Sequence, residues 1–431
     1  MRFTAPGSAP RPSHSSPHSS PADRPDRPGR QRSGVGRRWP AAAAAAALVT
    51  AGAAVAGQLP ADARGTAAPG YQQQDLRRDT DAIRTLGITG VQARVTTTGP
   101  GRDLVATSGT AEAGSHRPVP RNGYFRMAST GKALVATVVL QLVDEGTLSL
   151  GDTVDRWLPG LVRGNGNDGR RITLRHLLQH TSGIHDDELP GYATPQEYTE
   201  RRYDTYTPRQ IVTLAMRHHP DFRPGKGWSY SNTGYALLDM VIAKATGRPW
   251  HREVEDRILQ PLGMDRTYLP DTPALRRPHA DGYQVFPSGE RVDVTRVILP
   301  APGNYVSTTA DINRFFRALL GGDLLPQARL AEMQDTVEVD EGTQRFWPGG
   351  RYGLGLVNRP LSCGGSYWSH EGGDGGYITL NGATDDGSRT VTVSMSTALA
   401  DSPDNALRQE KAAGDLVDHA LCDAPGTEGD T

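Results

Sequence analysis

The feature that most constrains the fold is a long helical stretch that lies between two strand-rich segments. From about residue 152 to about residue 269 the spacing of apolar residues is mostly helical. The surrounding patterns are an opening helix at 73–87, a β-hairpin at 90–111, strand-like runs at 352–358, 376–383 and 389–398, and a last helix that carries Cys422. A helical lobe (152–289) inserted into an α/β lobe (71–151 and 290–422) explains this order most simply.

Two helices in this scheme have clear start signals. Thr207 precedes Pro208 at the first helical position, and Gln210 completes a capping box. Thr308 precedes another helical pattern, with Asp311 near the start of the helix. The sequence therefore predicts that Thr207 and Thr308 are N-caps.

The N-terminal region has the layout of an export signal. The first forty residues are rich in Pro, Ser and Arg and too poor in apolar residues to bury a core. An apolar run at 39–56 then follows Arg37 and Arg38 and ends in small residues, which is typical of a signal peptide.

This layout divides the chain into three parts. We expect 1–70 to be a disordered leader with the signal peptide, 71–422 to be the folded domain, and 423–431 to be a disordered tail. The folded part is then secreted or held in the cell envelope. An uncleaved apolar segment that anchors the protein is the alternative.

Charge and composition narrow the choice of partners and single out one lysine. A formal net charge of −1 gives no reason to expect a nucleic-acid partner. Only four of the 47 basic residues are lysines, and the first of these, Lys132, comes three residues after Ser129. The rarity of lysine suggests a chemical reason for its use at position 132, and the spacing to Ser129 supplies one.

Ser129 and Lys132 stand at the start of a predicted amphipathic helix that ends at Gly146. Residues three apart share a helix face, so the Lys132 amine can reach the Ser129 hydroxyl. A hydroxyl becomes a good nucleophile when a base takes its proton, and a buried lysine can be that base. Arginine cannot, because a guanidinium does not lose its proton. The alternative is an ordinary helix cap beside a solvated lysine.

Two further motifs shift the balance toward catalysis. One stretch contains Tyr230-Ser231-Asn232, and a later one contains His370-Glu371-Gly372 at the entry to a strand. With these motifs in this order the chain resembles the serine penicillin-recognising enzymes, which include D-alanyl-D-alanine carboxypeptidases, class C β-lactamases, esterases and D-aminopeptidases. The resemblance extends over 71–422 and is strongest to secreted D-Ala-D-Ala carboxypeptidases.

The resemblance implies both a fold and an activity. The fold is α/β (α+β), β-lactamase/transpeptidase-like, with an antiparallel sheet flanked by helices and an inserted all-α lobe. The activity is that of a serine hydrolase with an acyl-enzyme, in first place a D-alanyl-D-alanine carboxypeptidase-like peptidase of cell-wall peptides. An esterase, a D-aminopeptidase-like amidase and a non-catalytic protein that binds penicillin or peptidoglycan peptides are the alternatives.

The resemblance also assigns the catalytic roles. Ser129 would be the acylated nucleophile, Lys132 its proton acceptor, and Tyr230 the group that passes protons to the leaving amine and from the incoming water. Whether the lysine or the tyrosine is the working base stays open, so the two are assigned jointly.

The remaining site residues would bind the substrate. Asn232 would hold the acyl-side amide, and His370 would place a donor near Tyr230 and the substrate. Gly372 belongs to the strand motif, and the backbone N–H groups of Gly373 and Ser129 would form the oxyanion hole.

Other chemistry has weaker support. His176 and His180 have the i, i+4 spacing of zinc ligands, with His185, Asp186 and Asp187 close behind, but the glutamate of a zincin is missing. We therefore expect no metal and no cofactor. No stretch matches GxSxG, which argues against an α/β-hydrolase.

The two cysteines, Cys363 and Cys422, are too few for a metal cluster. In an exported chain they meet oxidising conditions, so we expect them to form one disulfide. Two buried free thiols are the alternative.

The expected substrates are small peptides, esters or amides, including peptidoglycan stem peptides, with β-lactams as acylating ligands and the protein as a monomer. Carboxypeptidase relatives bind the terminal carboxylate of the substrate with hydroxyl residues and an arginine. Here Glu371, Gly373 and Val357 stand at the hydroxyl and arginine positions, with Arg359 two residues further on. We therefore predict weak activity on D-Ala-D-Ala peptides relative to neutral esters or amides, or to substrates with a free amine, unless Arg359 supplies the clamp.

Overall fold

The computed structural model describes residues 70–99, 103–186, 193–298 and 304–423. The expected leader with its apolar run at 39–56 and the tail from residue 424 lie outside the described residues. Within the described part, none of the helices has both the length and the apolar character needed to span a membrane.

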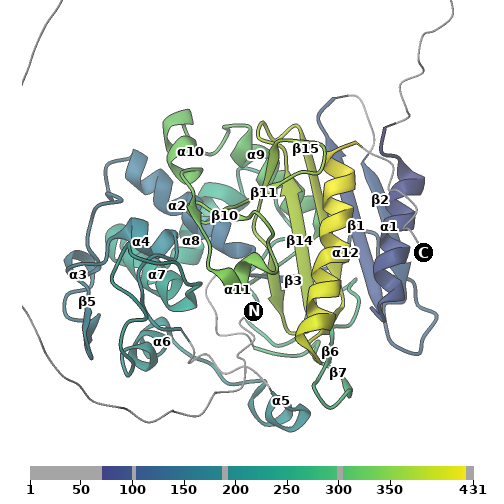
Figure 1. The fold of residues 1–431 in the computed structure, drawn as a ribbon, viewed down its shortest axis with the longest axis horizontal. Helices are drawn as coiled ribbons and strands as arrows, with labels where there is room; N and C mark the ends of the chain where they lie inside the picture. Colours follow the sequence, from purple (N-terminus) through teal and green to yellow (C-terminus); the bar gives the residue numbers. More distant parts are fainter. Residues whose placement is uncertain (1–69, 100–102, 187–192, 299–303, 424–431) are drawn as a thin grey trace, which may run out of the picture. The chain divides into compact units, whose positions relative to one another are not determined.

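A large antiparallel sheet carries the fold, and its strands come from both ends of the domain (Figure 1). The order is β2-β1-β15-β14-β12-β11-β10-β9, and β13 adds to β14. The strands are β1 Gly90–Thr97, β2 Leu104–Gly109, β9 Val337–Glu338, β10 Arg351–Tyr352, β11 Val357–Pro360, β12 Ser366–Ser369, β13 Gly372–Asp374, β14 Tyr377–Ala383 and β15 Arg389–Met395. The N-terminal hairpin therefore joins the C-terminal strands, as an insertion between them requires.

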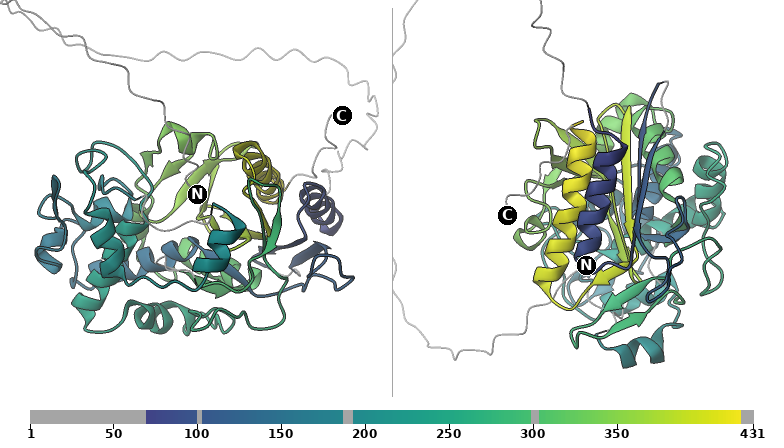
Figure 2. Two further views of the ribbon diagram at one scale, coloured as in Figure 1. Left: turned by 90° about the horizontal axis from the view of Figure 1, so that it is seen from below. Right: turned by 90° about the vertical axis from the view of Figure 1, so that its right-hand side faces the viewer.

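Helices α1 (Gln73–Thr85) and α12 (Pro403–Leu421) lie side by side on one face of the sheet, as the right-hand view of Figure 2 shows. Apolar residues of β1 and β15 at alternate positions pack against them, among them Val91, Val393 and Met395. The other face of the sheet carries α9 (Thr309–Leu320). The antiparallel sheet flanked by helices confirms the expected fold class.

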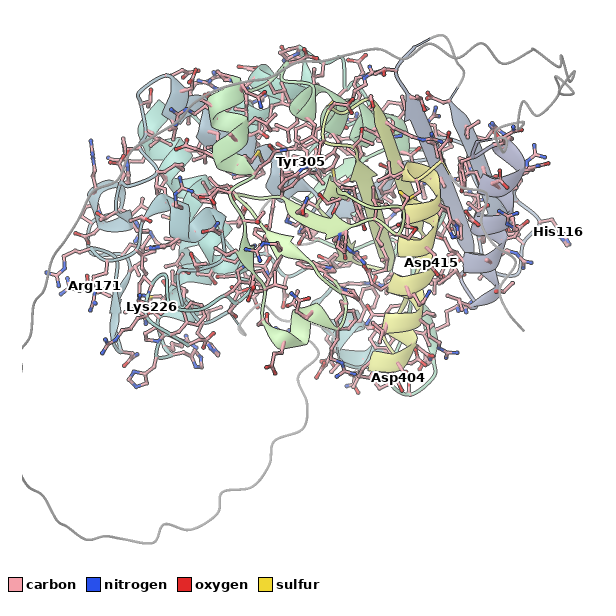
Figure 3. The ribbon with its side chains drawn as sticks, turned by 45° about the horizontal axis from the view of Figure 1, so that its top comes forward. His116, Arg171, Lys226, Tyr305, Asp404 and Asp415 are labelled. Carbon is pink, nitrogen blue, oxygen red and sulfur yellow. A yellow bond between two sulfur atoms is a disulfide. The ribbon has the colours of Figure 1, made fainter. Side chains whose placement is uncertain are left out.

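The middle of the chain is mainly helical. Its elements are α3 Val154–Trp157, β4 Arg163–Gly164, β5 Asn167–Asp168, α4 Leu174–Leu178, α5 Pro195–Arg201, α6 Pro208–Ala215, α7 Asn232–Thr246, α8 Trp250–Val254 and a π-helix at Glu255–Leu259. Figure 3 places Arg171 and Lys226 at the outer end of this part, whereas Asp404 and Asp415 lie along α12.

Strands resume at Tyr283, before residue 289, where we expected the helical lobe to end. β6 (Tyr283–Val285) pairs in parallel with β16 (Thr397–Leu399) and antiparallel with β7 (Arg291–Asp293). The stretch from 283 therefore belongs with the C-terminal strands, because its partner β16 follows directly on β15.

The remaining helices are α10 Gln327–Met333 and α11 Glu341–Gln344. Both predicted N-caps are confirmed. The Thr207 hydroxyl accepts from the Gln210 N–H at 3.3 Å in a capping box, and the Thr308 hydroxyl accepts from the Asp311 N–H at 3.4 Å.

Helix α2 (Gly131–Asp144) occupies the centre of the domain. Every residue from Gly131 to Leu140 is buried, so the helix is enclosed on all sides and the expectation of an amphipathic helix was wrong. It contacts α7 and α8 on the helical side, and its residues share one apolar core with those of α9. Half-buried Ser129 lies just before the first residue of this buried stretch.

Cys363 and Cys422 form a disulfide with an S–S distance of 2.06 Å. Cys363 lies in the turn between β11 and β12, and Cys422 directly follows α12. The bond therefore ties the end of the last helix to the sheet.

Candidate active site

A short strand and an irregular turn present Ser129. β3 (Phe125–Ala128) pairs with β8 (Tyr305–Ser307), and the pairing shifts register between Arg126 and Ala128. Ala128 has a φ of 47°, which is unusual for a residue with a side chain and marks a strained turn. The chain then enters α2, so half-buried Ser129 sits at the point where the strand becomes a helix.

Lys132 has the environment that a base needs. Its side chain is 0% exposed, whereas Lys226, Lys244 and Lys411 are exposed. Its Nζ lies 2.9 Å from Ser129 Oγ and 2.8 Å from the Asn232 Oδ1. Burial lowers the pKa of Lys132 to about 8, even though nearby carboxylates oppose the shift. A substantial fraction of the amine is therefore neutral near physiological pH.

Tyr230 completes this group from the loop before α7. Lys132 Nζ lies 4.9 Å from the centre of the Tyr230 ring. The Tyr230 hydroxyl oxygen is buried and has no hydrogen-bond partner in the described part of the chain. Burial raises the pKa of Tyr230, and the nearby Ser129 hydroxyl only partly opposes the shift. In the resting protein Tyr230 is therefore a neutral phenol.

Asp186, for which the sequence suggested no catalytic role, binds the N-terminus of α7. Ser231 is the N-cap, and its hydroxyl accepts from the Gly234 N–H at 3.0 Å. The Asp186 carboxylate accepts the N–H groups of Asn232 at 2.6 Å and Thr233 at 2.7 Å. Asp186 thus fixes the position of Asn232. The sequence signal was weak, because the two partners are 46 positions apart.

Gly372 lets β13 approach the nucleophile. A Cβ at Gly372 would lie 2.0 Å from the Met127 carbonyl oxygen and 2.9 Å from the Thr130 hydroxyl, so no side chain fits there. This close contact brings Gly373, the next residue of β13, to the segment that carries Ser129. The arrangement is consistent with the oxyanion-hole role expected for Gly373.

His370 makes contacts that differ from its expected role. Its Nε2 lies 3.0 Å from the Tyr352 hydroxyl, and its Nδ1 lies 2.8 Å from the Glu371 carbonyl oxygen. Burial, together with the nearby Lys132, lowers the pKa of His370 to about 3, so the ring is neutral. Both ring nitrogens are engaged within the protein, and the ring therefore does not present a donor to Tyr230 or the substrate. Buried Tyr352 was not identified from the sequence.

Arg359 is not free to clamp a carboxylate. Its Nη1 lies 2.7 Å from Glu371 Oε1 and 2.9 Å from Glu410 Oε1. Burial and the neighbouring Glu371 raise the pKa of Glu410 well above its usual range. Glu371 therefore faces Arg359, and Val357 is buried in β11.

Two more acids, of which Asp239 is buried and Asp374 half-buried, lie near Lys132 and were missed in the sequence. Asp239 on α7 and Asp374 on β13 both favour the charged form of Lys132. Burial raises the pKa of Asp374 to about 6 and that of Asp239 well above its usual range. Both acids oppose the shift, so burial is what lowers the pKa of Lys132.

His176 and His180 do not form a ligand pair. α4 ends at Leu178, and His180 turns away with a φ of 60°. His176 Nδ1 accepts from the Thr173 N–H at 3.2 Å, whereas Nδ1 of His185 lies 2.7 Å from Asp221 Oδ1. Asp186 caps α7, and Asp187 lies outside the described residues. In the described ranges no group of three His, Cys, Asp or Glu side chains could hold a metal ion.

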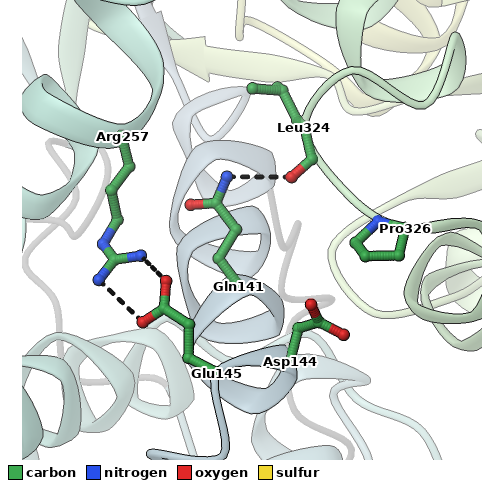
Figure 4. Close-up of a pocket in the computed structure, with 6 residues that line it drawn as sticks. All are labelled: Gln141, Asp144, Glu145, Arg257, Leu324 and Pro326. Atoms are coloured by element: carbon green, nitrogen blue, oxygen red, sulfur yellow. Dashed lines mark hydrogen bonds and ion pairs between the residues drawn. The ribbon is translucent and has the colours of Figure 1, made fainter.

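A hollow of about 290 Å³ lies at the far end of α2 from Ser129 (Figure 4). Its lining is Gln141, Asp144, Glu145, Arg257, Leu324 and Pro326. Arg257 pairs with Glu145 there, and none of the site residues takes part. This hollow is therefore separate from the candidate active site.

Comparison with known proteins agrees with this geometry. The family model described as Beta-lactamase matches residues 74–415. Penicillin-binding protein 4* of Bacillus subtilis (strain 168) is 30% identical over 291 residues, which cover 63% of this chain and 60% of that protein. The chain thus spans less than two thirds of this curated relative.

Solved structures match over more of the chain. A D-stereospecific amidohydrolase from Streptomyces sp. superimposes with a TM-score of 0.70 at 36% identity, covering 79% of this chain and 98% of that chain. A D-amino acid amidase from Ochrobactrum anthropi SV3 gives a TM-score of 0.69 at 27% identity, covering 81% and 97%.

Proposed function

The chain belongs to the beta-lactamase family of serine hydrolases, and from this premise we propose that it cleaves small amides, esters or peptides of D-amino acids through an acyl-enzyme on Ser129. The observation that carries the proposal is the contact between Ser129 Oγ and Lys132 Nζ at 2.9 Å, with the lysine fully buried. A buried amine beside a hydroxyl is the arrangement that activates a serine.

The first half of the reaction forms the acyl-enzyme. Neutral Lys132 takes the proton of Ser129 as the oxygen attacks the substrate carbonyl. The N–H groups of Ser129 and Gly373 stabilise the negative charge on the carbonyl oxygen. The C–N or C–O bond then breaks, and Tyr230 donates its proton to the leaving group while it receives the proton held by Lys132.

The second half releases the acid. A water molecule attacks the ester carbonyl and gives its proton to the Lys132–Tyr230 pair. Ser129 leaves and recovers a proton, so both side chains return to their starting states.

The leaving group is inferred from Arg359. Because this guanidinium binds Glu371 and Glu410, it offers little to a substrate carboxylate. We infer that neutral amides and esters are cleaved better than D-alanyl-D-alanine peptides. The names of the two solved relatives, an amidohydrolase and an amidase, support this choice.

The test compares one acyl group on three leaving groups: an amide, a methyl ester and D-alanine. We expect kcat/KM for the amide and ester to exceed that for D-alanine, and the D-acyl enantiomer to exceed the L form. Ser129→Ala serves as the blank. A clear preference for the D-alanine leaving group would overturn the assignment and reveal a carboxylate-binding cation elsewhere.

A carboxypeptidase acting on peptidoglycan stem peptides is the second candidate, and its support is the penicillin-binding relative. A non-catalytic binding protein is the third, but such a protein needs no buried lysine beside a serine. A labelled penicillin or fluorophosphonate separates the third from the first two. Covalent mass gain on Ser129 identifies an enzyme.

We also propose that the protein is exported. The support is the apolar run at 39–56 together with the Cys363–Cys422 disulfide, since disulfides persist in oxidising compartments. Expression of the full chain, followed by cell fractionation and N-terminal sequencing, tests this. A full-length protein in the cytoplasm would contradict it.

A further inference from the structure

A row of three buried polar side chains crosses the site behind Tyr230. His180 and Tyr352 are 0% exposed, and His370 is 1% exposed. The Tyr352 hydroxyl lies 3.1 Å from the Nε2 of His180 and 3.0 Å from the Nε2 of His370. The three residues come from the loop after α4, from β10 and from the loop before β13.

The two ends of the row fix where its protons lie. The Ser231 N–H donates to Nδ1 of His180 at 3.1 Å, so this nitrogen has no proton and the neutral ring carries its proton on Nε2. At the other end, the Glu371 carbonyl oxygen can only accept. His370 therefore carries its proton on Nδ1, 2.8 Å away, and its Nε2 is an acceptor.

The contacts of the three side chains then fit one continuous row of hydrogen bonds. Nε2–H of His180 donates to the Tyr352 oxygen, and the Tyr352 hydroxyl donates to Nε2 of His370. The hydroxyl of neighbouring Tyr235 donates elsewhere, to the Leu178 carbonyl at 3.0 Å. An added proton on either ring would remove one of the acceptors, so the intact row contains two neutral histidines.

The row ends on the two segments that the reaction needs. Ser231 lies between Tyr230 and Asn232, and the His180 ring also packs on the Tyr230 ring with centres 4.4 Å apart. Glu371 directly precedes Gly372 and Gly373. Through its hydrogen bonds the row connects the Tyr230 loop to the segment that enters β13.

We propose that Tyr352 is a positioning residue, which with His180 and His370 sets the distance between the Tyr230 hydroxyl and the oxyanion hole. The kinetic part of this inference rests on the acyl-enzyme function proposed above. The arrangement of protons in the row does not depend on that function.

The kinetic test is Tyr352→Phe, which keeps the aromatic ring and its stacking on Trp347 but removes the hydroxyl. Active sites are counted with a fluorophosphonate taken to completion. We expect kcat per active site to fall roughly tenfold to a hundredfold with KM nearly unchanged, because misplaced groups act mainly in the transition state.

The matched control is Tyr71→Phe, which removes a buried tyrosine hydroxyl that donates to Asp79 at 2.7 Å on the α1 side of the sheet. It should lower thermal stability without lowering kcat. If Tyr352→Phe affected only stability, as the control does, the positioning role would be refuted.

A second measurement determines directly which ring nitrogens of His180 and His370 carry a proton. Long-range ¹H–¹⁵N correlation at neutral pH, with signals assigned through His180→Asn and His370→Asn, should show the Nε2–H form of His180 and the Nδ1–H form of His370. The opposite form at either ring, or a charged ring, would overturn the row. If no probe labelled Ser129 in the wild-type protein, the proposed function and the positioning role would both be wrong. The protonated nitrogens of His180 and His370 would still test the hydrogen-bond arrangement of the row.

Discussion

At the scale of single residues, the contact between Ser129 and Lys132 gives the sharpest prediction. Ser129→Ala should abolish acylation and turnover, because it removes the hydroxyl that contacts Lys132 Nζ. The free energy of unfolding should change by no more than about 1 kcal/mol, since one half-buried hydroxyl contributes little. Intact-mass analysis with a labelled penicillin and chemical denaturation measure the two effects.

Lys132→Arg separates the charge of the lysine from its role as a base. The variant keeps a cation but cannot accept the Ser129 proton, so kcat/KM should fall about 10²-fold to 10⁴-fold. Lys244→Arg is the matched control, because Lys244 is exposed on α7. Activity of Lys132→Arg near that of the control would show that another group is the base.

The pKa of Lys132 also sets a pH dependence. The lysine must be neutral to accept a proton, and its pKa is about 8. Below that pH the neutral fraction falls tenfold per unit, so kcat/KM should rise with pH and level off above about 8. His370 does not contribute near neutrality, because its pKa is about 3. A profile that levels off at pH 6 would contradict the assignment of Lys132 as the base.

At the scale of elements, activity depends on the contact between β13 and the strand–helix turn that carries Ser129. Gly372→Ala would place a methyl group 2.0 Å from the Met127 carbonyl oxygen, so β13 must move away. We expect the acylation rate to fall at least about tenfold, since the oxyanion hole moves with β13. Gly151→Ala, where the nearest atom would be 3.7 Å from the new carbon, is the control and should acylate normally.

At the scale of the whole molecule, the Cys363–Cys422 disulfide holds the last helix on the sheet. The two cysteines are 59 positions apart, so the chain-entropy model gives a stabilisation of roughly 4 kcal/mol, less any strain. The double variant Cys363→Ser, Cys422→Ser should unfold at lower denaturant concentration, yet keep kcat at low temperature because the site lies elsewhere. Unchanged stability would mean that α12 is held by its packing alone.

The sequence by itself determined the features that depend on neighbours along the chain. Ser129 and Lys132 are three positions apart, and helix geometry alone places them together. The same holds for the capping of α6 by Thr207, and the alternation of β15 accounts for which of its side chains face α1 and α12. The order of helical and strand patterns was enough to predict an inserted helical part, and the resemblance then supplied the catalytic roles.

Only the tertiary structure decided the contacts between distant segments. Tyr352 lies 172 positions from His180, and Glu410 lies 51 positions from Arg359, so no local pattern links either pair. The role expected of His370 changed for this reason, because its ring bonds to Tyr352 instead of facing the substrate. The low pKa of Lys132 likewise comes from its complete burial, which depends on elements from distant parts of the sequence that pack around α2.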